Sequence, residues 1–316
     1  MKLGLVSNPA SGHGRHRSAE DLARGALVRR GHDLLVATST CYDTSRQAAT
    51  DLLGEGIDAL VVVGGDGMVH LGLDVVAQTD VPMGIIATGT GNDVARHFGL
   101  PARDVEAAAD IIDAALRGQG RIEACDAIHV TRPDGTRVPD EHEWCMATVG
   151  IGIDAQINAR ANALVWPHGE GRYLAAVLPE LAILRPFGYR VTTDSGTWAG
   201  PALVLAVANT RYIGGGMELA PTADTSDGLL DVLHLDPVGR LSLGRLVRRI
   251  FVGKHLDHPA VHHERTRAIV IEPWAGDAHW LRRPPLAFAD GEPLEHLPLR
   301  LRAAPGAVRV LLPAAQ

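Results

Sequence analysis

The first third of the chain alternates short apolar runs with stretches of helical periodicity. Four apolar runs predict strands at residues 2–7, 33–38, 59–63 and 83–87. Four segments with helical spacing follow them at residues 18–30, 45–53, 69–77 and 94–97. Strands that alternate with helices are typical of a parallel sheet with crossover helices, so this part is expected to be an α/β domain.

After about residue 126 the pattern changes to short alternating or β-branched runs separated by turn residues. These runs predict strands at residues 127–132, 143–149, 189–193, 202–208, 229–235, 268–272, 286–289 and 308–312. Such spacing is typical of an all-β domain, here with helical interruptions at residues 173–184 and 241–252. At roughly 150 residues per domain, the 316 residues fit two domains, which we place at 1–125 and 126–316.

Composition and charge narrow the function classes. The chain carries 30 Lys and Arg against 37 Asp and Glu, a net charge of -7, so no nucleic-acid partner is expected. Cys41, Cys125 and Cys145 show no C-x-x-C spacing, which argues against disulfides and a zinc site. The 15 histidines are interpreted as scattered surface residues rather than metal ligands. No apolar run suits a signal sequence or a membrane span, so a cytoplasmic location is expected.

Three polar turns follow strands of the predicted parallel sheet. They lie at residues 8–12, at residues 64–67 (Gly-Gly-Asp-Gly) and at residues 88–93. The carboxyl ends of parallel strands meet at one edge of a sheet, where ligands bind, and glycine-rich turns present backbone N–H groups to phosphates. Neither a G-x-x-x-x-G-K-[ST] motif nor a full G-x-G-x-x-G motif is present, which argues against Walker-type and Rossmann chemistry. The turns therefore predict a different kind of phosphate site.

Six blocks along the chain resemble the bacterial diacylglycerol kinase family, which also includes sphingosine and ceramide kinases. They are residues 8–12, 64–67, 88–96, 214–221, 227–232 and 290–292. The resemblance runs from residue 3 to about residue 312, whereas the Gly-Gly-Asp-Gly turn alone is shared with NAD kinases and phosphofructokinases. It implies an α/β N-terminal nucleotide-binding domain, a C-terminal β-sandwich domain and a lipid site in the cleft between them. It also implies ATP as phosphoryl donor and Mg2+ as cofactor.

The resemblance assigns roles to individual residues. Those implied to contact the nucleotide are Asn8, Pro9, Ala10, Ser11, Gly12, Thr40, Gly64, Gly65, Asp66, Gly67, Met68, Val69, His70, Thr90 and Asn92. For Thr40, the spacing leaves Thr38 as an alternative. Those implied to organise the catalytic magnesium are Asp66, Asp93 and Asp126. A structural magnesium is implied at the Asp227 side chain and the carbonyls of Asp224 and Leu229. Asp290 and Glu292 match the catalytic carboxylates, Glu292 as proton acceptor.

The chemistry of phosphoryl transfer to an alcohol suits these acids. It needs in-line positioning, magnesium to neutralise the phosphate oxygens and a carboxylate to take the hydroxyl proton. We therefore expect an ATP-dependent lipid kinase that converts a diacylglycerol-like lipid to phosphatidic acid or its analogue. An NAD kinase would leave the blocks at residues 227–232 and 290–292 unexplained.

Two departures from the family pattern keep other interpretations open. Met68 and Leu71 stand where the family commonly has Thr and Glu, so a catalytically inactive lipid-binding homologue remains an alternative. His70 is similar to the His of the sphingosine kinase branch, which leaves a sphingoid or other lipid substrate open.

The two helical interruptions bear on lipid and membrane contact. Segment 173–184 is apolar nearly all round, so it forms core or lines an acyl-chain cleft. Segment 241–252 has an apolar stripe with arginines elsewhere, and we favour packing on the sandwich over contact with an anionic membrane. A lipid substrate still implies peripheral contact with the membrane. The sequence leaves the oligomeric state open between monomer and homodimer.

Overall fold

The computed structural model describes residues 1–7, 15–39, 41–138, 142–163, 184–276 and 281–314. The chain divides into two compact units, Met1–Ala127 with Pro305–Gln316, and Ile128–Ala304. The chain passes from one unit to the other within β5 (Arg121–Thr131) and within β18 (Leu299–Leu312). The C-terminal segment, which we had assigned to the second domain, counts with the first unit because Val310 pairs with Met83 and Leu311 is buried in the first core.

The first unit is built on a parallel sheet, as predicted. Its strands are β1 (Lys2–Ser7), β2 (Asp33–Thr38), β3 (Ala59–Gly64) and β4 (Met83–Ala87). The order is β2-β1-β3-β4, with the end of β18 beside β4. The pairs β1–β2, β1–β3, β3–β4 and β4–β18 are parallel, and every residue of β3 is buried. A strand covered on both faces needs apolar side chains throughout, which explains the continuous apolar run of β3.

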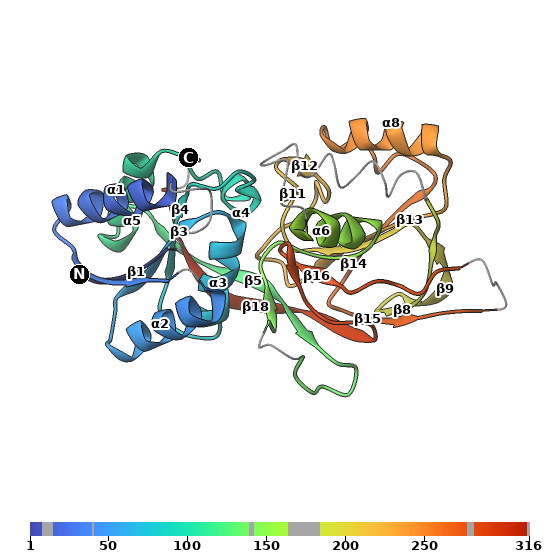
Figure 1. The fold of residues 1–316 in the computed structure, drawn as a ribbon, viewed down its shortest axis with the longest axis horizontal. Coiled ribbons are helices and arrows are strands. Elements are labelled where there is room, and N and C mark those ends of the chain that lie inside the picture. Colours follow the sequence, from blue (N-terminus) through green and yellow to red (C-terminus); the bar gives the residue numbers. More distant parts are fainter. Residues whose placement is uncertain (8–14, 40, 139–141, 164–183, 277–280, 315–316) are drawn as a thin grey trace. The chain divides into compact units, whose positions relative to one another are not determined.

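Helices cover both faces of this sheet (Figure 1). They are α1 (Arg15–Arg29), α2 (Tyr42–Gly54), α3 (Asp66–Val76), α4 (Asp93–His97) and α5 (Val105–Leu116). Helices α1 and α5 pack together on one face over a core that includes Leu5, Leu27 and Ile112. Helices α2 and α3 pack together on the other face. Helix α3 begins at Asp66, earlier than predicted, because the N–H groups of Met68 and Val69 already bond to the carbonyl of Gly65.

The second unit contains two packed sheets, which confirms the expected β-sandwich. One sheet has the order β14-β13-β10-β7-β16-β17, and the other contains β18, β15, β8 and β9. Their bounds are β7 (Thr148–Gly152), β8 (Phe187–Thr193), β9 (Gly196–Ala202), β10 (Val204–Ala208), β13 (Leu230–Leu235), β14 (Val261–Thr266), β15 (Ala268–Pro273), β16 (Phe288–Ala289) and β17 (Glu292–Pro293). One core joins the two sheets and includes Ile151 and Val232 from the first and Tyr189 and Ile271 from the second.

Smaller elements complete the second unit. They are β6 (Trp144–Cys145), which pairs with β5, the hairpin of β11 (Tyr212–Ile213) and β12 (Met217–Glu218), and helices α6 (Ile153–Ala163) and α8 (Arg240–Ile250). Helix α8 confirms the predicted helix at 241–252, whereas the predicted helix at 173–184 lies outside the described residues except for its last position. Within the described part of the chain, no helix is long and apolar enough to cross a membrane.

Candidate active site

Two glycine turns touch at the carboxyl edge of the parallel sheet. A Cβ atom on Gly89 would lie 2.4 Å from the Cα of Gly65, and one on Gly65 would lie 3.2 Å from the Cα of Gly89. The N–H of Thr88 donates to the carbonyl of Gly64 at 2.8 Å, which ties the ends of β4 and β3. Gly65 has φ of −97°, which any residue adopts, so close approach of the two backbones is what requires glycine here.

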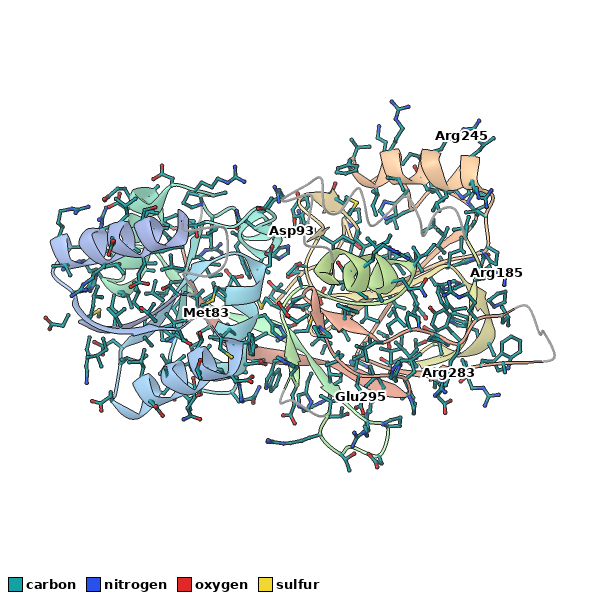
Figure 2. All side chains as sticks on the ribbon, viewed as in Figure 1. Met83, Asp93, Arg185, Arg245, Arg283 and Glu295 are labelled. Carbon is teal, nitrogen blue, oxygen red and sulfur yellow. The ribbon has the colours of Figure 1, made fainter. Side chains whose placement is uncertain are left out.

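Asp66 and Asp93 supply carboxylates to these turns. An Asp66 carboxylate oxygen accepts the N–H of Val94 at 3.2 Å and so caps α4 from the neighbouring turn. Asp93 is the first residue of α4 and is 6% exposed; its Oδ1 lies 3.1 Å from Nη1 of Arg96 (Asp93 is labelled in Figure 2). Carboxylate oxygens are the ligands that Mg2+ prefers. The donor set therefore fits a magnesium ion beside the two glycine turns.

Asn92 and Thr90 complete the second turn. Asn92 takes the left-handed conformation, with φ of 53°, and its side-chain amide donates to the carbonyl of Gly89 at 2.9 Å. Asparagine tolerates this conformation because its side chain hydrogen-bonds locally. Thr90 is exposed, so its hydroxyl is accessible to a ligand.

Three of the predicted nucleotide contacts on α3 have buried side chains. Met68 is 7% exposed, Val69 3% and His70 0%. Met68 lies against Gly64, where a Cβ atom would come within 2.4 Å of its Cγ. His70 lies 3.8 Å from Asp74 through Nε2 and Oδ2, and Tyr42 donates to the same Asp74 oxygen at 2.9 Å. A ligand at these positions would therefore meet backbone atoms of the helix start rather than the side chains.

The remaining predicted nucleotide contacts and Asp126 are placed differently. Residues 8–12 and Thr40 lie outside the described residues. Thr38, the alternative to Thr40, ends β2 and donates to Glu20 at 3.1 Å, while Ser7 donates to the second oxygen of the same carboxylate. Asp126 is 2% exposed and accepts the N–H of Gly306 at 3.0 Å, which joins β5 to β18. No pattern in the sequence distinguishes Glu20 from other acidic residues of α1.

Asp290 is held by four donors from a single loop. Its carboxylate accepts the N–H of Met146 at 2.7 Å, of Ala147 at 2.8 Å and of Thr148 at 3.1 Å, and it lies 3.1 Å from the thiol of Cys145. The thiol stays protonated, because burial first and the charge of Asp290 second raise the pKa of Cys145. Asp290 takes a left-handed conformation at the tip of the β16–β17 hairpin, with φ of 52°.

Glu292 follows on the same hairpin and has a different environment. It pairs with Ala289 across the hairpin and is half-buried. Among the described residues, no hydrogen bond or ion pair to its carboxylate is found. The geometry therefore separates the two acids that the sequence treated as a pair, with Asp290 fixing the hairpin and Glu292 left available to a substrate.

The carboxylate of Asp227 already has two donors. Its Oδ1 accepts the N–H of Leu229 at 2.9 Å across the left-handed Gly228, and its Oδ2 pairs with Arg265. Asp224 accepts the N–H of Ser226 at 3.0 Å. A magnesium ion on Asp227 would have to displace Arg265. The predicted structural magnesium site therefore fits a cation only if the ion takes the place of the guanidinium.

Asp154 is a buried acid that the sequence analysis missed. Burial raises the pKa of Asp154 to about 6, and its Oδ1 finds no hydrogen-bond partner among the described residues. It lies at the start of α6, directly after β7, where a Cβ on Gly150 would overlap with its carboxylate. The Gly-x-Gly-x-Asp spacing at the end of a buried strand is the signal that points to this residue.

Solved structures share this two-unit fold. The chain matches a diacylglycerol kinase from Bacillus anthracis str. Sterne with a TM-score of 0.70 at 19% identity, covering 98% of this chain and 96% of that one. It also matches yeast NADH kinase in complex with NADH, with a TM-score of 0.56 at 11% identity, covering 100% of this chain and 84% of that one. At these identities the likeness shows the fold alone.

Sequence comparisons show the family. Residues 2–125 match the diacylglycerol kinase catalytic domain, and residues 147–312 match the YegS C-terminal NAD kinase beta sandwich-like domain. A diacylglycerol kinase from Mycobacterium tuberculosis (strain H37Rv) is 37% identical, covering 99% of this chain and 95% of the relative. A "Probable lipid kinase YegS-like" from Stenotrophomonas maltophilia (strain K279a) is 30% identical, covering 86% of this chain and 84% of the relative. The chain belongs to the bacterial diacylglycerol kinase and YegS-like lipid kinase family.

Proposed function

We propose that this chain is a Mg2+-dependent kinase that transfers the γ-phosphoryl group of ATP to the hydroxyl of a diacylglycerol-like lipid. The product is phosphatidic acid or its analogue. The observation that carries the proposal is the contact between Gly65 and Gly89, which brings two glycine turns together beside Asp66. Backbone N–H groups and a carboxylate in one place suit a phosphate chain and its metal ion.

The nucleotide is held by the first unit. The turn at residues 64–67 and the start of α3 offer N–H groups to the phosphates, and the positive end of the helix dipole favours their charge. Asp66 and Asp93 hold the magnesium ion, which neutralises phosphate oxygens when bound. The other proposed nucleotide contacts are Asn8, Pro9, Ala10, Ser11, Gly12, Thr40, Thr90 and Asn92, and Asp126 is proposed to support the metal site.

The proton of the lipid hydroxyl passes to Glu292. This assignment is supported by the half-buried carboxylate of Glu292, for which no partner is found among the described residues. Asp290 acts as a positioning residue, since its oxygens already accept the N–H groups of residues 146–148. In a loose phosphoryl transfer the hydroxyl proton leaves late, so the base contributes about 10²–10⁴-fold to the rate.

The acceptor is proposed from the relatives. Those that cover most of this chain are named diacylglycerol kinase and YegS-like lipid kinase, which supports a lipid alcohol and leaves its headgroup to be measured. A lipid acceptor requires peripheral contact with a membrane, where the hydroxyl lies at the interface.

An acceptor panel tests the proposal. Purified protein, ATP labelled at the γ-phosphate and Mg2+ are mixed with diacylglycerol, monoacylglycerol, ceramide, sphingosine, undecaprenol or NAD, and the labelled product is identified. We expect labelled lipid, with diacylglycerol best, and a loss of labelling in Asp66→Asn. Labelled NADP, or no transfer to any lipid, would overturn the proposal. A labelled sphingoid base would keep the lipid kinase and replace its substrate.

A further inference from the structure

Helix α8 turns two apolar residues inward and leaves a mixed apolar and cationic face outside. Leu243 and Leu246 are 6% and 5% exposed and pack with Leu203 and Leu235. On the outside, Leu241 is 83% exposed, and the exposed stretch continues past the end of the helix to Phe251 at 54% and Val252 at 60%. The expected packing on the sandwich is therefore correct for one side of the helix only.

Within the second unit, the exposed large apolar side chains are concentrated at this helix. In the described part of the second unit, the large exposed apolar residues are Leu241, Val247, Phe251 and Val252, all on α8 or directly after it. Exposed single apolar residues are normal on a protein surface, whereas a cluster rimmed by polar groups marks an interaction site.

Cations surround these apolar side chains. Arg245 and Arg248 are exposed on α8, and Lys254 is exposed just beyond it; Figure 2 shows Arg245 pointing away from the rest of its unit. Neither arginine has an ion-pair partner among the described residues, while Arg249 pairs with Asp257 at 3.4 Å. The chain as a whole carries a net charge of -7, so this cationic face stands against the overall charge.

We propose that the outer face of α8, formed by Leu241, Arg245, Val247, Arg248, Phe251 and Val252, docks on an anionic lipid bilayer. Apolar side chains next to arginines are what an interfacial helix presents, because the apolar groups enter the acyl region while the cations meet anionic headgroups. A second copy of the chain fits less well, since a symmetric contact would bring the same cations face to face. This inference rests on the proposed function, which needs access to a lipid.

Vesicle binding tests the docking surface without turnover. The full chain is sedimented with vesicles of phosphatidylcholine alone or mixed with phosphatidylglycerol. We expect binding to the mixed vesicles, about thirtyfold weaker in Arg245→Gln/Arg248→Gln. We expect it to be at least about tenfold weaker in Leu241→Ser/Phe251→Ser. The matched control, Leu22→Ser/Val28→Ser on α1, removes two exposed apolar side chains elsewhere and should bind as wild type.

A second readout separates the docking surface from the kinase reaction. Turnover of a short-chain lipid dispersed as monomers should be the same in the α8 variants and in wild type, because α8 takes no part in the chemistry. Equal vesicle binding in wild type and both α8 variants would overturn the docking proposal. The docking proposal would also be overturned if the α8 substitutions changed only the oligomeric mass of the protein in solution and not its vesicle binding, since this would show a contact between copies. Binding that depends on α8 without any turnover would leave docking standing and refute the kinase.

An independent observation concerns two histidines on the sandwich. His234 and His262 lie directly opposite each other on β13 and β14, and their rings stack at 4.4 Å between centroids. Asp236 lies two residues after His234 along the chain, and its Oδ2 is 2.8 Å from Nε2 of His262. The three potential ligand atoms all lie within 4.8 Å of one another. The interpretation of the histidines as scattered is therefore wrong for His234 and His262, which strand pairing brings together. Their interpretation as surface residues is wrong for His32, His70 and His255, which are buried.

We infer that His234, His262 and Asp236 form a binding site for a borderline divalent cation such as Zn2+. Two imidazoles and a carboxylate are a usual protein ligand set for zinc, with water completing the coordination. The planes of the two rings are 18° from parallel, so sharing an ion needs a small rotation of the side chains.

Calorimetric titration with Zn2+ tests this site. Chelator-treated protein should bind zinc, and His262→Ala and His234→Ala should each weaken binding by at least about tenfold. His296→Ala removes an exposed histidine elsewhere in the same unit and should leave the affinity unchanged. Wild-type affinity in both site variants, or no zinc binding by the wild type, would overturn the inference.

Discussion

Gly65 and Gly89 lie so close that a Cβ atom on Gly89 would sit 2.4 Å from the Cα of Gly65. The two glycines come from different turns of the parallel sheet, so this contact joins the ends of β3 and β4 into one surface. The carboxylates of Asp66 and Asp93 belong to the same pair of turns. Nucleotide binding should therefore depend on the absence of side chains at both glycines.

Gly89→Ala should weaken ATP binding by at least about tenfold, because the added methyl group forces the two turns apart. Gly65→Val should do the same through the 3.2 Å approach from the other side. The control is Gly54→Ala, where an added Cβ meets no atom within 4 Å. Calorimetry measures the affinity, and circular dichroism checks the fold. ATP affinity that is normal in Gly89→Ala would show that the turns serve the fold only.

Removing the charge of Asp290 should lower stability, whereas removing the charge of Glu292 should lower turnover. Asp290→Asn replaces an oxygen that accepts N–H groups, so the free energy of unfolding should fall by about 1.5–3 kcal/mol. Glu292→Gln should leave the melting temperature and the ATP affinity nearly unchanged and lower turnover by about 10²–10⁴-fold. Thermal melting and steady-state kinetics on the best lipid separate the two effects. Near-normal turnover in Glu292→Gln would move the base elsewhere, with Asp66 and Asp93 as first candidates.

Asp227 and Arg265 decide whether magnesium stabilises the second unit. If magnesium displaces Arg265 from Asp227, added Mg2+ should raise the melting temperature of the wild type, because a ligand that binds only the folded state stabilises it. Asp227→Ala should lower the melting temperature and abolish the response. Arg265→Ala should strengthen the response, since the carboxylate then lacks its guanidinium. A wild-type melting temperature that ignores Mg2+ would show that the ion pair with Arg265 takes the place of a metal.

Because of Asp154, the free energy of unfolding should fall as the pH rises from about 4 to about 6. The pKa of Asp154 is raised to about 6 in the folded protein against an ordinary value of 3.8, so over this range the folded state holds a proton that the unfolded chain has lost. Each rise in pH then favours unfolding, by roughly 2–3 kcal/mol in total, and the effect levels off above pH 6. Asp154→Asn should remove this part of the slope, as measured by urea unfolding across the range. An identical slope in the variant would contradict the assignment.

The sequence predicted the sheet of the first unit well because its signals are local. A continuous apolar run identifies β3, and the turns after β3 and β4 carry their glycines next to the strand ends. Helix α5 was missed although Asp104 caps it by accepting the N–H of Ala107 at 3.0 Å, followed by a run of alanines. Both its cap and its composition were visible in the chain.

The parts that escaped prediction depend on long-range pairing. The difference between Asp290 and Glu292 arises because the loop at residues 145–148 folds over one acid and leaves the other, and nothing in the Asp-Gly-Glu letters tells them apart. The pairing of His234 with His262 requires the register of β13 against β14. The exposure of Leu241 depends on which side of α8 packs, which helical periodicity alone left open.

Phosphoryl transfer from ATP to a lipid alcohol can be followed through the fate of the γ-phosphate. Phosphorus NMR of the purified protein with ATP, Mg2+ and dispersed short-chain diacylglycerol resolves ADP, inorganic phosphate and a lipid phosphomonoester. The lipid phosphomonoester and ADP should appear in equal amounts, and Asp66→Asn should form neither. ADP that accumulates with inorganic phosphate alone, or ATP that stays intact with every lipid offered, would contradict transfer to a lipid alcohol.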